Sequence, residues 1–439
     1  MTRTDRWVVA ALLALAAALR LHALGATPLD ADEAAHAWRA LRLATAGDAS
    51  LAGLTSPFAA AAQAVVFAFL GADEARARLP SVVCGLALVL APVLVWPALG
   101  RVRVLSLCAL LACDPWLVGW SRRATGESAA ALAAALVVLG LLRWRAAART
   151  RADVGRLLAL QAAAAAGFLV TTGPAAWGLL PPLALIAWRL RPWSTAAIQP
   201  GRLLATATVS ALGCATVGLL AIPWASAVSA SLTVALAGAA GPSALASFVA
   251  VPSATIVLAA VGLAGTPRRL AHAGAIAWGV LAAAASSHGL LALTLACAAC
   301  AADGVGALVA TRGRGRARLA LAAVLAIVVL AWQPPAPARL PEDRALRALA
   351  ADVRETAVER GHAANEMPLV IVQDPPDAEV AWALRDVRSL EWAAVRPAAR
   401  GAAPLLVAPA DATGAPEAYE RRVYGAGPHA VSLWVPRAR

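Results

Sequence analysis

The sequence lacks lysine altogether and is poor in charged residues of every kind. All 38 basic residues are arginines, only 14% of the 439 residues are charged, and 61% are apolar. Soluble domains carry about 25% charged residues, so the composition argues against a soluble multidomain protein. The net charge of +13 does not indicate nucleic-acid binding, because the arginines gather in short segments between long apolar runs. This pattern predicts a polytopic membrane protein.

Cysteine is scarce as well. The six cysteines all lie in apolar runs: Cys84, Cys108, Cys113, Cys214, Cys297 and Cys300. There is therefore no disulfide framework. Cys297 and Cys300 form a CxxC pair, but neither polar ligands nor a βαβ pattern flanks it. Small core residues are favoured over a redox or metal site.

Apolar runs bounded by charges, Pro or Gly predict eleven membrane spans. They cover residues 7–24, 80–99, 102–119, 127–144, 156–172, 174–190, 203–222, 244–264, 270–287, 289–310 and 317–333. The first run is a full-length span without a small-residue cleavage site after it. We therefore expect no cleaved signal peptide.

The arginines predict the side of the membrane that each connection faces. We number the connections between successive predicted spans along the chain. Eighteen arginines lie at the N-terminus and in the even-numbered connections. Six lie in the odd-numbered connections: Arg39, Arg42, Arg76, Arg78, Arg122 and Arg123. By the positive-inside rule the N-terminus is cytoplasmic, and the tail after eleven spans is outside. Eight of the eleven acids in the membrane part map to the outer face. Acids contribute little to topology, so their concentration there indicates outward-facing chemistry.

Three carboxylates and a histidine lie close together in the first outer loop, in "PLDADEAAHAW" (28–38). In a helix, Asp32 and Glu33 share a face with His36, four and three residues away. Such a face could bind a divalent metal ion, or one carboxylate could take a proton from an attacking hydroxyl. The alternative is a solvated helix start with Asp30 as its N-cap.

A second cluster, in "WSRRATGE" (120–127), stands where an outer loop enters the fourth predicted span. Arg122 or Arg123 could bind a phosphate through two parallel hydrogen bonds, and Glu127 could complete a carboxylate pair with Asp32. The alternative is that the arginines reach to lipid headgroups. His288, in "SSHG" between two spans, could donate to a phosphate or occupy a polar turn.

Two further regions are not predicted as spans. The apolar piece at 57–71, inside the long first outer loop (about 25–79), is too short to span and predicts an interfacial or re-entrant helix. The tail predicts an amphipathic helix at its start, strands at 368–373, 403–409 and 430–436, and a helix at 377–387. This alternation is typical of a small α/β domain. We expect two domains, residues 1–337 and 338–439.

Three stretches together resemble the opening of GT-C glycosyltransferases, polytopic enzymes that use polyprenyl-phosphate-linked sugars. They are "RLHALGATPLDADEAAHAW", "SPFAAAAQAVVFAFLGADEARARLPSVVCGLALVLAPVL" and "PWLVGWSRRATGESAAALAAAL". Protein O-mannosyltransferases and the lipid A aminoarabinose transferase belong to this superfamily. The Asp-Glu-x-x-His form resembles a prokaryotic branch described as flippase-activity-associated and glycosyltransferase-like, which has a tail motif similar to "WALRD" (382–386). The resemblance implies a GT-C-like helical membrane fold of about eleven spans, with a small α/β domain outside.

The resemblance also implies roles for residues. Asp32, beside Glu33, would be the base or a metal ligand, and Glu127 stands where the second acid of the family is usually Asp. The implied metal ligands are Asp32, His36 and Glu127. The chain departs from the family in lacking a His before "TSPF" and in reducing a His-rich stretch to His288. Such departures are typical of a diverged member.

We therefore expect an inverting glycosyltransferase of a bacterial or archaeal plasma membrane. The donor is a polyprenyl-phosphate-linked sugar whose phosphate meets Arg122, Arg123 and His288. The acceptor is a glycan, lipid or protein on the outer face, and a divalent metal ion is the one cofactor to consider. Partners are membrane lipids and no nucleic acid. The alternative is a non-catalytic or flippase-associated membrane protein that binds lipid-linked sugars.

Overall fold

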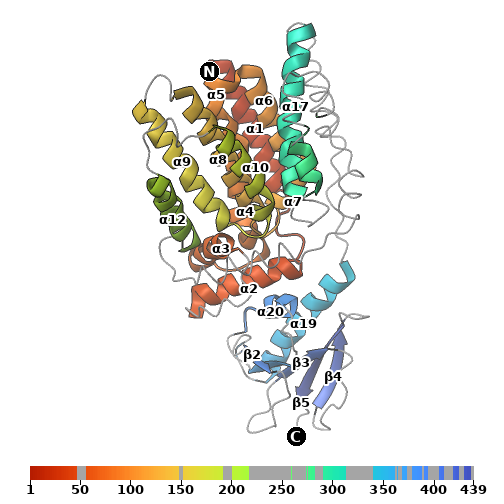
Figure 1. Cartoon of the computed structure of the whole chain (residues 1–439). Helices are drawn as coiled ribbons and strands as arrows, with labels where there is room; N and C mark the ends of the chain where they lie inside the picture. Colours follow the sequence, from red (N-terminus) through yellow and green to blue (C-terminus); the bar gives the residue numbers. More distant parts are fainter. Residues whose placement is uncertain are drawn as a thin grey trace. The chain divides into compact units, whose positions relative to one another are not determined.

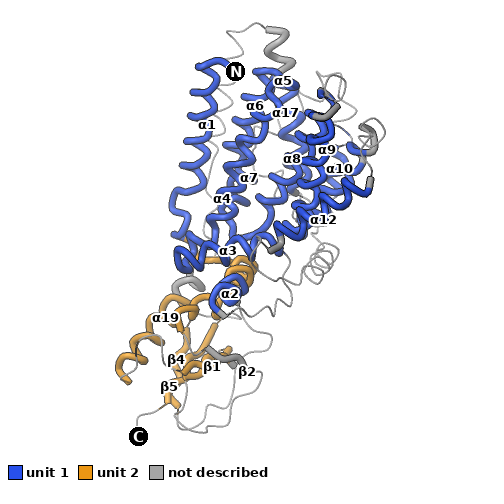
Figure 2. Tube along the Cα trace, turned by 90° about the vertical axis from the view of Figure 1, so that its left-hand side faces the viewer, with its two compact units in different colours: residues 1–26, 39–334 blue, residues 27–38, 335–439 orange. Residues whose placement is uncertain are grey.

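The computed structural model describes residues 1–46, 56–147, 152–190, 200–216, 259, 273, 275–281, 290–312, 340–360, 363, 368–372, 378–387, 390–393, 405–409, 419–424 and 430–436. The chain divides into two compact units (Figure 2). One consists of Met1–Ala26 and Arg39–Pro334, the other of Thr27–Trp38 and Pro335–Arg439. A short segment of the predicted first outer loop therefore belongs to the same unit as the tail.

The first unit is a bundle of helices (Figure 1). They are α1 (Arg3–Leu21), α3 (Pro57–Leu70), α4 (Glu74–Leu90), the 3-10 helix η1 (Ala91–Val95), α5 (Trp96–Leu99), α6 (Arg101–Cys113), α7 (Pro115–Ser121), α8 (Glu127–Ala147), α9 (Ala152–Val170), α10 (Ala175–Leu190), α12 (Pro200–Thr216) and α17 (Leu290–Arg312). A further helix, α2 (Ala31–Ala46), begins in the second unit and ends in the first. The main group of buried apolar side chains joins α1, α4, α6, α8, α9, α10 and α17 and is rich in alanine. Such small side chains let neighbouring helices approach closely.

Two described helical stretches, Glu74–Leu99 and Glu127–Arg145, are long and apolar enough to cross a membrane. A third joins them if α6 and α7, bent by 59°, form one span. The predicted spans at 7–24, 156–172, 174–190, 203–222 and 289–310 coincide with helices α1, α9, α10, α12 and α17. The predicted spans at 244–264, 270–287 and 317–333 lie largely or wholly outside the described residues. The total of eleven thus stays a prediction.

The bend between α6 and α7 follows from the dipeptide Asp114–Pro115. Proline has no N–H to continue the hydrogen bonds of α6. The buried carboxylate of Asp114 accepts instead from the N–H groups of Trp116 (3.0 Å) and Leu117 (3.1 Å) and so caps α7. A new helix therefore starts directly after the old one ends.

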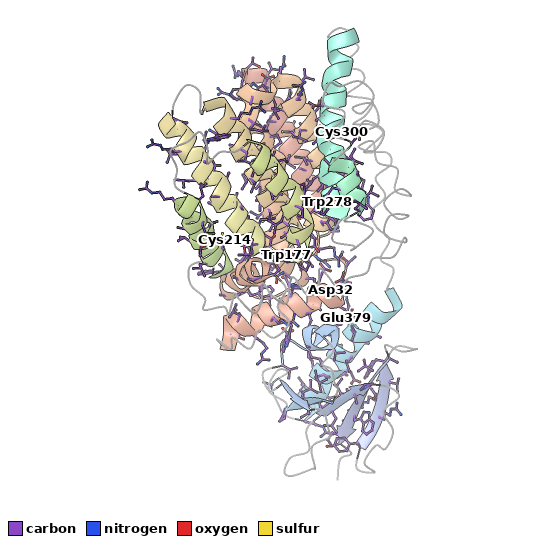
Figure 3. The ribbon with its side chains drawn as sticks, in the orientation of Figure 1. Asp32, Trp177, Cys214, Trp278, Cys300 and Glu379 are labelled. Atoms are coloured by element: carbon purple, nitrogen blue, oxygen red, sulfur yellow. The ribbon has the colours of Figure 1, made fainter. Side chains whose placement is uncertain are left out.

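The cysteines are core residues, as predicted. All six are free, and all except the half-buried Cys214 are buried. The thiol of Cys300 donates to the carbonyl oxygen of Ala259 (3.1 Å). Figure 3 labels Cys214 and Cys300 on their helices.

The tail contains α19 (Leu340–Glu359), α20 (Ala378–Ala383) and a mixed five-stranded sheet. The strands are β1 (Leu369–Val372), β2 (Leu390–Ala393), β3 (Leu405–Pro409), β4 (Tyr419–Tyr424) and β5 (Val431–Pro436). The sheet order is β2-β1-β3-β5-β4; β1 is parallel to β2 and β3, and β5 is antiparallel to β3 and β4. The predicted α/β pattern is present. Strand β4, with the sequence "YERRVY", was not predicted, because charges on an edge strand hide its alternation.

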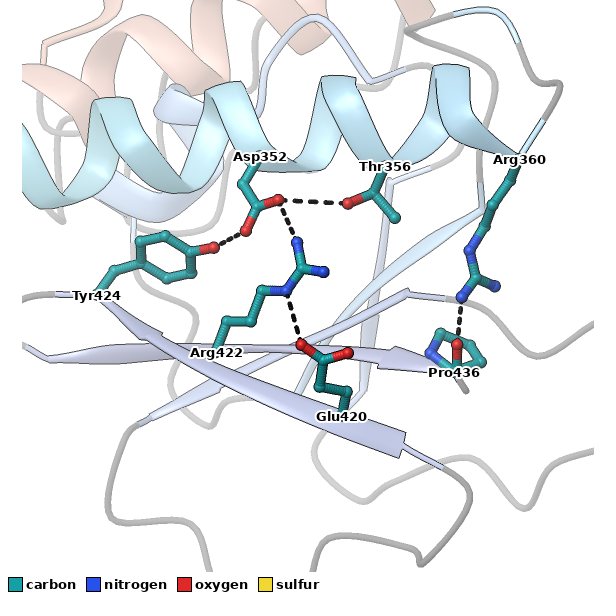
Figure 4. A network of polar contacts seen from close by, with 7 residues as sticks. All are labelled: Asp352, Thr356, Arg360, Glu420, Arg422, Tyr424 and Pro436. Atoms are coloured by element: carbon teal, nitrogen blue, oxygen red, sulfur yellow. Dashed lines mark hydrogen bonds and ion pairs between the residues drawn. The ribbon is translucent and has the colours of Figure 1, made fainter. Parts of the chain in front are cut away.

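A polar network fixes α19 to the edge strand β4 (Figure 4). The carboxylate of Asp352 accepts from Arg422 at 2.6 Å and from the hydroxyl group of Tyr424. The hydroxyl of Thr356 lies 3.4 Å from the same carboxylate, and Arg422 also pairs with Glu420 at 3.2 Å. Helix and sheet of the tail are therefore joined by a shared carboxylate as well as by apolar packing.

Candidate functional site

The acidic segment, residues 30–36, forms the start of α2. The carboxylate of Asp30 accepts from the N–H of Glu33 (2.9 Å), and the carboxylate of Glu33 accepts from the N–H of Asp30 (3.1 Å). This reciprocal capping box satisfies two N–H groups at the helix start. Glu33 is only 3% exposed. The predicted cap role of Asp30 is confirmed, and Glu33, a predicted catalytic residue, has a structural task.

Asp32 differs from its neighbours in the acidic segment. Its side chain is exposed, and Figure 3 shows it on α2. Its carboxylate has no hydrogen bond or ion pair with any other residue that the structure describes. The buried His36 uses Nδ1 to donate to the main-chain carbonyl oxygen of Asp32 (2.8 Å). Asp32 is therefore the most exposed of the three carboxylates in the segment.

The basic loop, residues 121–128, joins α7 to α8 and is held by side chains of α3 and α4. The amide of Gln63 donates to the carbonyl oxygens of Ala77 (3.0 Å) and Ala124 (2.9 Å). The hydroxyl of Ser81 donates to the carbonyl oxygen of Thr125 (2.7 Å). Both donors are buried. The main chain of the loop thus has partners supplied by residues far away in the sequence.

Gly126 brings the basic loop against the turn that follows α9. A Cβ atom at this position would lie 1.8 Å from the carbonyl oxygen of Thr172 and 2.6 Å from the hydroxyl of Ser56. Ser56 itself donates to the carbonyl oxygen of Thr172 (2.9 Å) and caps α3. Three segments meet here with no room for a side chain, so only glycine fits.

Three side chains of the basic loop remain partly accessible: Arg122, Arg123 and Glu127 are half-buried, whereas the other five residues are buried. Arg122 donates through Nη1 to the carbonyl oxygen of Leu19 (3.2 Å). Glu127 is the first residue of α8, where the helix dipole favours a carboxylate. The arrangement is a fixed main chain that presents two guanidinium groups and one carboxylate.

A third arginine acts on the basic loop. Arg78 of α4 is 3% exposed and donates to the carbonyl oxygen of Leu24 (2.7 Å). Burial lowers the pKa of Arg122, and the positive charge of Arg78 lowers this pKa further. An anion bound near both cations would gain from each charge. From the sequence alone Arg78 is one outer arginine among six, because an arginine at the start of an apolar helix is expected to reach water.

The described residues do not provide a complete ligand set for a metal ion. No three His, Cys, Asp or Glu side chains gather as ligands among them. Of the predicted ligands, Asp32 and His36 belong to the second compact unit and Glu127 to the first. His288, the predicted donor to the phosphate, lies outside the described residues. Metal binding therefore stays a prediction.

Solved structures of similar fold include ArnT from Cupriavidus metallidurans. Its apo state matches with a TM-score of 0.63 at 15% identity, and ArnT bound to undecaprenyl phosphate with 0.60 at 16%. Each match covers 99% of this chain and 98% of ArnT. The archaeal oligosaccharyltransferase AglB from Archaeoglobus fulgidus, in complex with an inhibitory peptide and a dolichol-phosphate, matches with 0.55 at 10% identity, over 89% of this chain and 64% of AglB. No protein-family model and no curated protein matches the chain.

The chain shares its fold with ArnT and AglB. ArnT and AglB are GT-C glycosyltransferases, and the match to ArnT extends over nearly the whole length of both chains. The predicted resemblance is confirmed at this level, and with it a helical membrane fold. Identities of 10–16% establish the fold alone, since one fold hosts many functions. Kinship with the flippase-associated branch stays a prediction.

Proposed function

We propose that this protein is a membrane glycosyltransferase that uses a polyprenyl-phosphate-linked sugar as donor. The observation that carries the proposal is the basic loop, whose buried main chain presents Arg122 and Arg123 while Arg78 adds a third positive charge. Guanidinium groups bind phosphate through paired hydrogen bonds. Two proteins of the same fold, ArnT and AglB, are known with undecaprenyl phosphate and dolichol-phosphate, respectively. This supports a polyprenyl phosphate as the lipid partner.

The reaction is a single displacement that inverts the anomeric centre. Asp32 takes the proton of an acceptor hydroxyl. The hydroxyl oxygen attacks the anomeric carbon, the bond from this carbon to the phosphate oxygen breaks, and polyprenyl phosphate leaves with the electron pair. Arg122 and Arg123 stabilise the charge on the leaving phosphate. We assign Glu127 as a second acidic residue of the site and His288 as a further donor to the phosphate.

The proposal has a sidedness, taken from the arginine asymmetry of the sequence. It requires a cytoplasmic N-terminus and a tail domain outside, where a glycan, lipid or protein accepts the sugar. A reporter that is active only in the cytoplasm should be inactive when fused after Arg439 and active when fused after Arg149. The reverse pattern would contradict the sidedness.

A transfer assay tests the activity itself. The purified protein receives a radiolabelled polyprenyl-phosphate sugar and membranes from a deletion strain. We expect the label to move into a glycan, lipid or protein fraction with the wild type and with Asp30→Asn, but not with Asp32→Asn. If the wild type binds the donor and leaves the label on it, the alternative holds, namely a non-catalytic or flippase-associated protein that binds lipid-linked sugars.

A further inference from the structure

A buried cation lies directly behind the basic loop. Arg20, near the end of α1, is 0% exposed. Its guanidinium group donates to the hydroxyl of Ser121 through Nε (3.2 Å) and to main-chain carbonyl oxygens through both terminal nitrogens. These carbonyl groups belong to Ala16, Leu111 and Ala112, at 3.3, 2.9 and 2.9 Å. A buried arginine with so many donors engaged has a specific task, because burying a charge is costly.

Two of the three carbonyl groups that Arg20 binds, those of Leu111 and Ala112, are groups that the bend between α6 and α7 leaves without helical partners. In a continuous helix, Leu111 would accept from residue 115, which is a proline without N–H. Ala112 would accept from Trp116, whose N–H donates to the carboxylate of Asp114 instead (3.0 Å). Arg20 supplies both missing donors (2.9 Å each). Its guanidinium group therefore stabilises the bend itself.

The remaining hydrogen bond of Arg20, to Ser121, fixes the end of α7, where the basic loop begins. The hydroxyl of Ser121 accepts from Arg20 Nε (3.2 Å) and from the hydroxyl of Ser128 (3.3 Å), and it donates to the carbonyl oxygen of Leu117 (2.6 Å). Both ends of the basic loop, Ser121 and Ser128, thus meet at one oxygen atom. The loop is closed on itself at the point where Arg20 holds it.

A glycine of helix α4, Gly85, leaves room for the contact between Arg20 and Ser121. A Cβ atom on Gly85 would lie 2.2 Å from the hydroxyl of Ser121 and 3.0 Å from Arg20 Nε. On the other side, Arg122 donates to the carbonyl oxygen of Leu19, the residue before Arg20 (3.2 Å). The end of α1 therefore holds two successive residues of the loop, Ser121 by its side chain and Arg122 by its guanidinium group.

We propose that Arg20 is a positioning residue for recognition of the donor phosphate. It does not touch the phosphate; it fixes the end of α7 through Ser121 and so sets the direction in which Arg122 and Arg123 leave the loop. The inference rests on the proposed function, because it takes these two arginines as the phosphate ligands. Bidentate contacts depend on orientation, so a small displacement of the loop weakens them.

The first test removes the link and keeps Arg20. Ser121→Ala deletes the hydroxyl at which Arg20, Ser128 and Leu117 meet. The matched control is Ser106→Ala on α6, a buried serine whose hydroxyl has no hydrogen-bond partner among the described residues. We expect Ser121→Ala to weaken binding of undecaprenyl phosphate about five- to tenfold, the size of one net hydrogen bond, and Ser106→Ala to leave it unchanged. Both are measured by titration of the full-length protein in detergent.

A second measurement separates positioning from a general loss of structure. Because Ser121 acts through Arg122 and Arg123, its substitution should have less than about a twofold effect in an Arg122→Ala/Arg123→Ala background, as expected for coupled residues. An equal loss in both backgrounds would overturn the inference. Arg20→Lys keeps the charge but cannot make all the contacts of a guanidinium group, and we expect about tenfold weaker binding with this variant. Unchanged binding by Arg20→Lys would also count against the inference.

These outcomes are distinguishable from failure of the proposed function. If the wild type binds undecaprenyl phosphate but transfers no sugar, the proposed activity is wrong, while the binding of Ser121→Ala still decides the role of Arg20. If the wild type transfers sugar and Ser121→Ala binds the lipid phosphate as tightly as Ser106→Ala, the inference alone is wrong. If the wild type does not bind the lipid phosphate, both are wrong.

Discussion

The acidic segment and the basic loop are held in opposite ways. Short-range hydrogen bonds stabilise the acidic segment: those of Asp30 with Glu33, and that of His36 with the carbonyl oxygen of Asp32. The basic loop depends on distant partners, since Gln63, Ser81 and Arg20 reach it from other helices. The first arrangement is that of any capped helix start, whereas the second exists only when the bundle is assembled.

This difference separates two kinds of functional residue. In the acidic segment, local hydrogen bonds engage Asp30, Glu33 and one nitrogen of His36, whereas the side chain of Asp32 is exposed, as the proposed role of a general base requires. In the basic loop the fixed part is the main chain, and the side chains of Arg122 and Arg123 remain half-buried. Substitutions in the acidic segment should therefore act one residue at a time. Substitutions of residues that hold the basic loop should change the positions of Arg122 and Arg123 together.

The largest expected effect is on turnover, from Asp32→Asn. Asparagine has nearly the same shape but cannot accept a proton at neutral pH, so turnover should fall by about 10²–10⁴-fold, the usual contribution of a general base. Binding of the lipid phosphate should change much less. Initial rates of transfer, with matched expression checked by gel filtration, measure the effect. Equal turnover in Asp32→Asn and wild type would leave the acidic segment as a helix start only.

The second-largest expected effect is on binding of the lipid phosphate. It comes from replacing Arg122 or Arg123 with lysine. Lysine carries the charge but cannot form the bidentate contact, and we expect a cost of about 1.5–3 kcal/mol. Arg76→Lys is the control, because Arg76 is a half-buried arginine that pairs with Asp73 at 3.1 Å. The dissociation constant of undecaprenyl phosphate is the readout. Normal binding by the Arg122→Ala/Arg123→Ala variant would mean that these residues only anchor the loop at the interface.

Gly126→Ala tests whether the main chain of the basic loop is the fixed part. The new Cβ atom would lie 1.8 Å from the carbonyl oxygen of Thr172, so the loop must move. We expect a loss of about 1–3 kcal/mol in stability, the range for overpacking, together with weaker phosphate binding. Gly119→Ala on α7 is the control, since nothing lies within 4 Å of a Cβ there. Thermal unfolding in detergent compares the two; equal midpoints would contradict the packing argument.

The smallest expected effect comes from the cap of the acidic segment. Asp30→Ala removes the N-cap carboxylate and should cost about 1 kcal/mol of stability. Asp30→Asn should restore it, because asparagine is as good an N-cap as aspartate. Turnover per folded molecule should stay near that of the wild type in both variants. A loss of turnover as large as that of Asp32→Asn would mean that Asp30, too, takes part in the chemistry.

Much of the fold follows from patterns along the chain. The apolar runs predicted the helices from α4 to α12, and the tail pattern predicted β1, β3, β5 and the two helices around β1. Strands β2 ("LEWA") and β4 ("YERRVY") were not predicted, because charged side chains interrupt the apolar pattern in each of them, and both lie at an edge of the sheet. The candidate residues Asp32, Arg122, Arg123 and Glu127 were recognisable because charge is rare in this chain. The sequence did not predict which of these four side chains are accessible to solvent.

The sequence by itself determined the apolar helices, the cap at Asp30 and the break at Pro115. These depend on periodicity, on a side chain three residues from its partner, and on a missing N–H, all of which are local. Only the tertiary structure decided that Arg20 and Arg78 are buried, that Gly126 lies against Thr172, and that Gln63 and Ser81 hold the basic loop. An arginine near a helix end gives the same sequence pattern in two cases: when its side chain reaches water, and when it binds the carbonyl groups of a neighbouring helix. The choice depends on which carbonyl groups the packing of distant helices leaves without donors.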